Sequence, residues 1–102
     1  MLALSALAEP TRCRIVELLA EHGRLPARQI SRRFPISPAA ISQHLKILKA
    51  AKLVRVEVKA QSRIYSLNPD GIDEIEQWVA KLKQLWVQRF DALDNLLNEE
   101  TE

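Results

Sequence analysis

The stretch SPAAISQHLKILKAA, from Ser37 to Ala51, decides how this chain folds. Ser37 followed by Pro38 is a typical helix start, because Ser caps free backbone N–H groups and Pro suits the first helical position. Apolar residues then recur at i, i+4 and i+7, which predicts one buried stripe: Ile41, Leu45 and Leu48. Ile47 is expected to widen this stripe. The opposite face of the helix is therefore expected to point outward, and it is small and polar: Ala39, Ser42, Gln43, Lys46 and Lys49.

Two helices are expected at the start of the chain. Residues 2–8 are mostly apolar and form a short first helix. Pro10 begins a second helix, because its missing N–H costs nothing in a first helical turn. That helix runs through Glu21, and Gly23 is placed to end it.

A third, short helix is expected to open at Leu25-Pro26, with Ile30 and Phe34 four residues apart on its buried face. Pro35 cannot continue that helix, so the chain must turn there before it enters the helix that starts after Ser37.

Downstream of residue 51 the apolar period changes from that of a helix to that of a strand. Residues 54–59 alternate valines with charged residues. Residues 63–67 (RIYSL) are expected to form a second alternating strand. The turn between them, residues 60–62, makes the pair a β-hairpin. Asn68-Pro69 then caps a last helix that runs from about Gly71 to Leu97, with apolar residues every three or four positions.

The order of these elements predicts a mainly helical fold with a small β-hairpin. A short helix, a tight turn and a second amphipathic helix with a small polar face form the helix-turn-helix pattern, and the hairpin directly after it makes the winged form. We expect one domain over residues 1–102. Its helix-turn-helix core and wing occupy residues 9–68, and the helices at residues 2–8 and 70–98 flank them.

Charge is distributed unevenly, although the net charge is only +2. Residues 1–69 hold 12 basic and 4 acidic residues, whereas residues 70–102 hold 3 basic and 9 acidic ones. A basic body with an acidic last helix favours a surface that faces a polyanion.

Four features of the basic body point to duplex DNA as that polyanion. Ser42 and Gln43 can reach base edges in the major groove. The helix start, with Ser37, Pro38 and Ala39, can hold a phosphate through its N–H groups. Basic residues that surround this helix suit contacts to the DNA backbone: Arg28, Arg32, Arg33, Lys46 and Lys49. The expected wing tip can enter the minor groove or clamp the backbone: Gln61, Ser62 and Arg63.

The last helix has more apolar surface than one seam against its own core needs, so it should also bury a face against a partner. Trp78, Trp86 and Phe90 could instead line a ligand pocket between subunits, but packing is the more common role of aromatic residues at helical spacing.

The chain also resembles the arsenical-repressor (ArsR) family of bacterial winged-helix repressors. The resemblance covers about residues 4–68 and lies in residues 7–12 (LAEPTR), 36–49 (ISPAAISQHLKILK), and 53–55 with 64–67 (LVR, IYSL). It implies a homodimer built from the first and last helices, a palindromic operator, and base contacts from Ser42 and Gln43. Lys52 and residues 60–62 depart from glycines that are usual in the family. The apolar residues expected at the dimer interface are Leu2, Leu4, Leu7, Trp78, Leu82, Leu85, Trp86, Phe90 and Leu93.

Known metal sites of that family have no counterpart here. The region from Leu25 to Phe34 contains no cysteine, and residues 70–102 contain no histidine, so neither a thiolate site nor a zinc site on the last helix is available. We therefore expect no metal and no cofactor. The last helix resembles a metal-free branch whose members are often autoregulators.

The remaining chemistry-bearing residues favour structural roles. His44 flanks the buried stripe and is expected to bond within the fold rather than to DNA or a metal. Cys13 is expected to be a small core residue rather than a thiol switch. The carboxylates form no catalytic set, so we expect no enzyme. The lone cysteine and the lack of a long apolar run favour a cytoplasmic protein.

These patterns predict a sequence-specific DNA-binding repressor. Two alternatives stay open: a winged-helix module that uses its basic face on a protein or an RNA, and a repressor released by a thiol oxidant or a small-molecule inducer.

Overall fold

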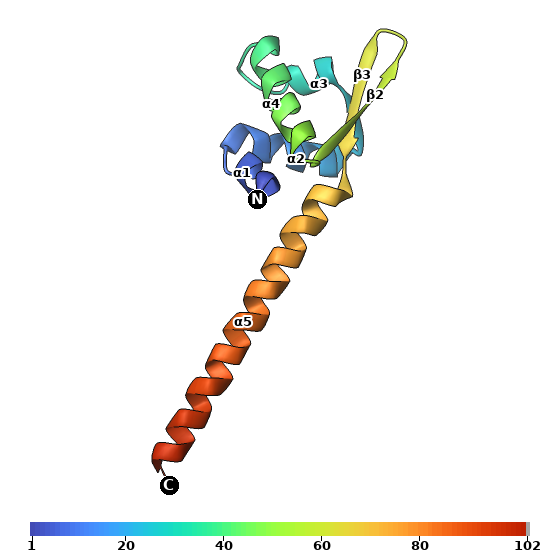
Figure 1. Cartoon of the computed structure of the whole chain (residues 1–102). Helices are drawn as coiled ribbons and strands as arrows, with labels where there is room; N and C mark the ends of the chain where they lie inside the picture. Colours follow the sequence, from blue (N-terminus) through green and yellow to red (C-terminus); the bar gives the residue numbers. More distant parts are fainter. Residues whose placement is uncertain (102) are drawn as a thin grey trace.

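The computed structural model describes residues 1–101, with side chains through residue 98, so Glu102 of the expected domain lies outside the described residues. Helices α1 to α4 cluster into one body, a hairpin rises along its side, and the last helix leaves it as a single rod (Figure 1). The elements are α1 (Leu2–Leu7), α2 (Pro10–His22), β1 (Arg24–Pro26), α3 (Ala27–Ser31), α4 (Pro38–Ala50), β2 (Val54–Lys59), β3 (Ser62–Leu67) and α5 (Pro69–Thr101).

Helix α4 begins as the sequence predicts. Ser37 has an extended backbone, and its Oγ accepts a hydrogen bond from the Ala40 N–H at 3.1 Å, while Pro38 takes the first helical position. The predicted stripe is fully buried: Ile41, Leu45 and Leu48. Ile47 does not widen it. Its side chain is 42% exposed, because it lies off the face that meets the core.

The chain between α2 and α3 is a strand, so the prediction that a helix opens at Leu25-Pro26 is wrong. Strand β1 pairs antiparallel with β3, which gives a three-stranded sheet in the order β1-β3-β2. Leu25 pairs with Tyr65, and both are buried. Pro26 lacks an N–H and is tolerated because β1 is an edge strand. Helix α3 is correspondingly short and ends at Ser31, so Phe34 packs against the core from the turn rather than from a helix.

The hairpin forms the expected wing. Strands β2 and β3 pair in a register that sets Val56 opposite Tyr65 and Val58 opposite Arg63. Because alternate residues of a strand point to the same face of a sheet, Arg63 lies on the same face as the buried Tyr65. The turn is tighter than expected, since Ser62 already belongs to β3.

Helix α5 is anchored where it begins. The Asn68 side chain accepts a hydrogen bond from the Asp70 N–H at 3.1 Å, and the Gly71 N–H donates to the Lys52 carbonyl at 2.8 Å. A Cβ on Gly71 would lie 2.6 Å from that carbonyl oxygen, so only glycine permits this approach. The start of α5 is therefore tied to the loop that follows α4.

Beyond this anchor, α5 extends away from the body (Figure 1), and the Cα atoms of the chain span 73 × 25 × 21 Å. Large apolar side chains stay exposed along its described length: Ile72, Trp78, Val79, Leu82, Leu85, Trp86, Val87, Phe90, Leu93, Leu96 and Leu97. Among the described residues, no helix combines the length and the apolar character needed to cross a lipid bilayer.

Lys52 offers a test of the loop after α4. Its φ of 59° is left-handed, a region in which a residue with a Cβ is strained by about 1–2 kcal/mol. We expect Lys52→Gly to be about 1 kcal/mol more stable toward unfolding than Lys52→Ala, after glycine's entropic cost is subtracted. Urea unfolding at one protein concentration measures this difference. Equal stability of the two variants would contradict a strained left-handed backbone at this position.

Candidate nucleic-acid interface

The exposed face of α4 carries the side chains that the sequence singles out. Helix α4 is held by its buried stripe, and its other side is open: Ala39, Ser42, Gln43, Lys46 and Lys49 are all exposed. Ser37 and Pro38 are exposed at its start. The face is small near its beginning and basic toward its end, which is the profile of a helix that fits a groove of DNA.

A groove runs between this face and the wing. Its walls come from α3, α4, β2 and β3: Ala27, Ser42, Gln43, Leu45, Lys46, Lys49, Val56, Arg63 and Tyr65. Arg63 reaches it because the strand register turns it to the Tyr65 face of the sheet. The structure thus brings residues predicted separately on the helix and on the wing into one concave surface, which we call the helix–wing groove.

The wing tip meets the start of α3 in a second hollow beside that groove. Arg28 lines it together with Pro26 and Ala27, opposite the predicted wing residues Gln61, Ser62 and Arg63. Arg33 is not part of either surface. It borders a different hollow with Phe34 and residues of α2, so the structure separates it from Arg28, Lys46 and Lys49.

Among the described residues, no carboxylate pairs with the basic side chains of these two surfaces. Within the part of the chain that the structure describes, no ion pair or hydrogen bond involves the side chains of Arg28, Lys46, Lys49 or Arg63. By contrast, Arg24 and Lys59 both pair with Glu57 on the other face of the hairpin. Unpaired cations around a concave surface leave their charge available to an anionic ligand.

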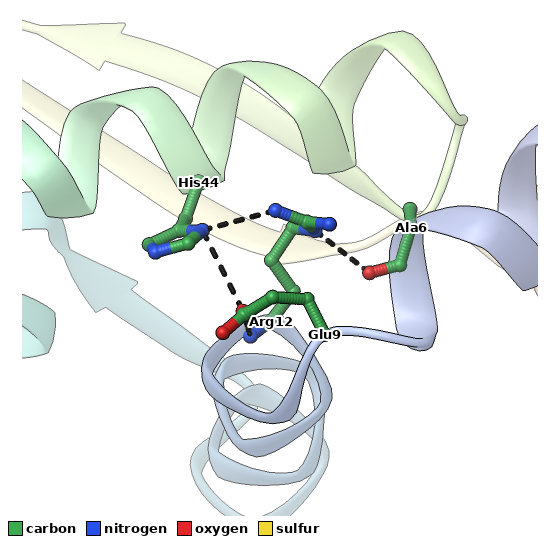
Figure 2. A network of polar contacts seen from close by, with 4 residues as sticks. All are labelled: Ala6, Glu9, Arg12 and His44. Atoms are coloured by element: carbon green, nitrogen blue, oxygen red, sulfur yellow. Dashed lines mark hydrogen bonds and ion pairs between the residues drawn. The ribbon is translucent and has the colours of Figure 1, made fainter.

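A polar network behind α4 was only partly predicted (Figure 2). The Glu9 side chain caps α2 by accepting a hydrogen bond from the Arg12 N–H at 2.9 Å. Arg12 Nη1 donates to His44 Nδ1 at 3.2 Å, and Glu9 Oε2 lies 3.7 Å from the same nitrogen. His44 therefore bonds within the fold, as predicted. The role of Arg12 was missed, because its partner His44 is remote in sequence.

Two predicted residues, Cys13 and Leu7, differ from expectation in their surroundings. Cys13 is partly exposed, with its Sγ 3.7 Å from Glu17 Oε1, so its prediction as a core residue is wrong. The buried face of α2 is instead formed by its neighbours Ile15, Val16 and Leu19. Leu7, predicted at the dimer interface, packs partly against the core of its own chain, whereas Leu2 and Leu4 are exposed.

In the single chain, the aromatic residues of α5 are exposed on the surface of the helix. The rings of Trp86 and Phe90 lie one turn apart with centroids separated by 5.3 Å, and Trp86 is 66% exposed. Among the described residues, no three His, Cys, Asp or Glu side chains are close enough together to hold a metal ion.

A helix-turn-helix followed by a hairpin, with a basic groove between helix and hairpin, defines a winged helix-turn-helix protein. The comparisons with known proteins agree. Residues 7–57 match a family described as a helix-turn-helix domain. The chain is 38% identical over 98 residues to the HTH-type transcriptional regulator Rv2034 of Mycobacterium tuberculosis, which covers 96% of this chain and 88% of that protein.

A further relative and a solved structure indicate which family of helix-turn-helix regulators the chain belongs to. The chain is 38% identical over 74 residues to the transcriptional repressor SdpR of Bacillus subtilis, with 72% of this chain and 81% of SdpR covered. A solved structure described as a possible transcriptional regulator for arsenical resistance is similar with a TM-score of 0.72 at 35% identity, and covers 91% of this chain and 93% of that one. The chain belongs to the ArsR family of winged helix-turn-helix regulators.

The Glu9 cap predicts a pH dependence of stability. The Arg12 backbone N–H, more than any other group, lowers the pKa of the Glu9 carboxyl below its ordinary value. A carboxyl with a lowered pKa stabilises the fold above its unfolded pKa, and this contribution disappears as the pH falls through the folded pKa.

We therefore expect Glu9→Gln to be less stable than the unchanged chain at neutral pH. The difference should shrink as the pH is lowered through the carboxyl range near about pH 4. Urea unfolding across this range measures it. A difference that stays constant with pH would mean that the Glu9 charge does not contribute.

Proposed function

We propose that this protein is a sequence-specific transcriptional repressor that binds duplex DNA with α4 in the major groove. The observation that carries the proposal is the helix–wing groove, where hydrogen-bonding side chains of α4 and unpaired cations face the same space. SdpR, which is 38% identical to this chain over 74 residues, is named a transcriptional repressor, and this supports the same role here. The proposed repressor needs no metal, no cofactor and no catalytic step. We place it in the cytoplasm.

The proposed contacts divide between bases and backbone. Ser42 and Gln43 lie on the exposed, small part of α4 and can hydrogen-bond to base edges. Long cationic side chains suit phosphates, and we assign this role to Lys46 and Lys49 farther along α4, Arg28 on α3 and Arg33 in the turn after α3. The start of α4, with Ser37, Pro38 and Ala39, faces one further phosphate. The wing residues Gln61, Ser62 and Arg63 follow the backbone or the minor groove.

A homodimer is the second part of the proposal. The apolar face of α5 is exposed over most of its described length, and single chains rarely leave so long an apolar surface in water. Leu2 and Leu4 add exposed apolar area on α1, which contacts α5. A symmetric dimer through these two helices reads a palindrome whose half-sites are about 34 Å apart, one turn of DNA.

Two substitutions on α4 separate base reading from phosphate binding. Gln43→Ala should relax the preference at one operator position, at a cost of about 1–3 kcal/mol for the preferred base pair. Lys46→Ala should weaken binding to all duplexes alike and lower the slope of log K against log salt by about one. Fluorescence anisotropy titrations at several salt concentrations, with preferred and random duplexes, measure both effects.

Equal affinity of the unchanged protein for every duplex, or no affinity for DNA, would contradict the repressor assignment. Retained binding to an RNA or to a protein under those conditions would favour an interaction module instead.

The dimer has its own test on α5. Trp86→Glu puts a charge on the exposed apolar face and should shift the sedimentation-equilibrium mass toward that of one chain. Gln84→Glu is the matched control, because at 3.6 residues per turn it lies about 200° around the helix from Trp86. The control should keep the dimeric mass. A monomeric unchanged protein, or an equal response of both variants, would contradict the proposed interface.

A further inference from the structure

One side chain links three helices at the back of α4. Arg12, on α2, donates through Nε to the Ala6 carbonyl at 2.7 Å and through Nη1 to His44 Nδ1 at 3.2 Å (Figure 2). Ala6 lies near the end of α1, and His44 lies in the middle of α4. We call this connection the Arg12 bridge.

We propose that Arg12 and His44 are positioning residues for DNA binding. The Arg12 bridge fixes the orientation of α4 relative to α1, and through α1 it sets how the two α4 helices of a dimer are spaced. This inference rests on the proposed function and adds to it the residues that control half-site spacing.

The α4 end of the bridge adds a directional restraint to the packing of the core. The buried stripe of α4 is held by apolar contacts, which depend on area and have no preferred direction. A hydrogen bond is directional, and it weakens steeply when its angle changes. His44 adjoins Gln43 in the chain, so a bond at His44 restricts the rotation of α4 that aims Ser42 and Gln43 outward.

The α1 end of the bridge connects to the proposed dimer interface. The Ala6 carbonyl belongs to the last turn of α1, where carbonyls have no partner within the helix, and Arg12 supplies one. Ala6 is buried, and α1 contacts both α4 and α5. Helix α1 therefore lies between the long helix that would hold the partner and the helix that would enter DNA.

The chemistry of the bridge defines which replacements keep it. An arginine side chain has donors and no acceptor, so His44 must accept at Nδ1 and carry its proton on Nε2. The amide oxygen of an asparagine occupies nearly the same place as Nδ1 and is also an acceptor. Leucine fills a similar space but accepts nothing. The Glu9 carboxylate, which accepts from the Arg12 backbone N–H, is unchanged in either variant.

The test compares binding to three duplexes: the operator selected from a random pool, the same operator with one base pair inserted between its half-sites, and a random sequence. The unchanged protein should lose most of its affinity on insertion, because one base pair rotates a half-site by roughly 35°. His44→Leu should bind the operator about tenfold more weakly, a usual size for coupling between sites. Its loss on insertion should be smaller, and its affinity for random duplex unchanged. His44→Asn should restore the behaviour of the unchanged protein.

Two further variants keep the test decisive. Ile15→Val removes one methyl group from the buried face of α2 and lowers stability without touching the bridge, so it should keep the full insertion penalty. Arg12→Lys keeps the charge but cannot bond both acceptors, and it should behave as His44→Leu does, which covers a failure of that variant to fold.

A full insertion penalty in His44→Leu and Arg12→Lys would overturn the inference while leaving the DNA-binding role intact. The same holds if Ile15→Val loses the penalty as they do, since the effect would then follow stability alone. If the unchanged protein shows no preference for any duplex, the proposed function itself fails.

Discussion

Burial of one stripe of α4 is the interaction on which the rest of the structure depends. Ile41, Leu45 and Leu48 are almost completely removed from water, and each such side chain contributes about 1.5–3 kcal/mol by burial. Because the helix repeats every 3.6 residues, fixing this stripe inward fixes Ser42, Gln43 and Lys46 outward. The Ser37 cap determines where the helix begins. The packing that stabilises the fold is therefore also what presents the proposed DNA-contacting side chains.

The sheet supplies the second half of the surface through its register. Pairing of Leu25 with Tyr65 attaches the hairpin to the body, and the alternation along β3 then turns Arg63 toward α4. Acidic Glu57 lies on the opposite face, where it pairs with Arg24 and Lys59. The cations toward the helix–wing groove have no such neighbour among the described residues. Charge is thus sorted by the two faces of one hairpin.

Elements with strong local signals were predictable from the sequence, and long-range pairings were not. The cap at Ser37, the stop at Gly23 and the alternating valines of β2 each depend on neighbouring residues, and all three predictions were confirmed. Strand β1 has only three residues, and it forms because it pairs with β3, about 40 positions away. The local sequence at Leu25-Pro26 therefore predicted a helix start instead of a strand. The Arg12 bridge depends likewise on the remote His44. Five residues of the helix–wing groove were predicted individually as DNA contacts: Ser42, Gln43, Lys46, Lys49 and Arg63. Their grouping, and the separation of Arg33 from them, required the fold.

Whether the exposed face of α4 reads a DNA sequence can be measured by selecting bound duplexes from a random pool, because this selection assumes no operator in advance. We expect enrichment of one palindromic sequence with half-sites about one DNA turn apart. We also expect Gln43→Ala to select a sequence relaxed at one symmetric pair of positions. A pool that stays random after repeated rounds, or one enriched identically by both proteins, would rule out base reading by α4.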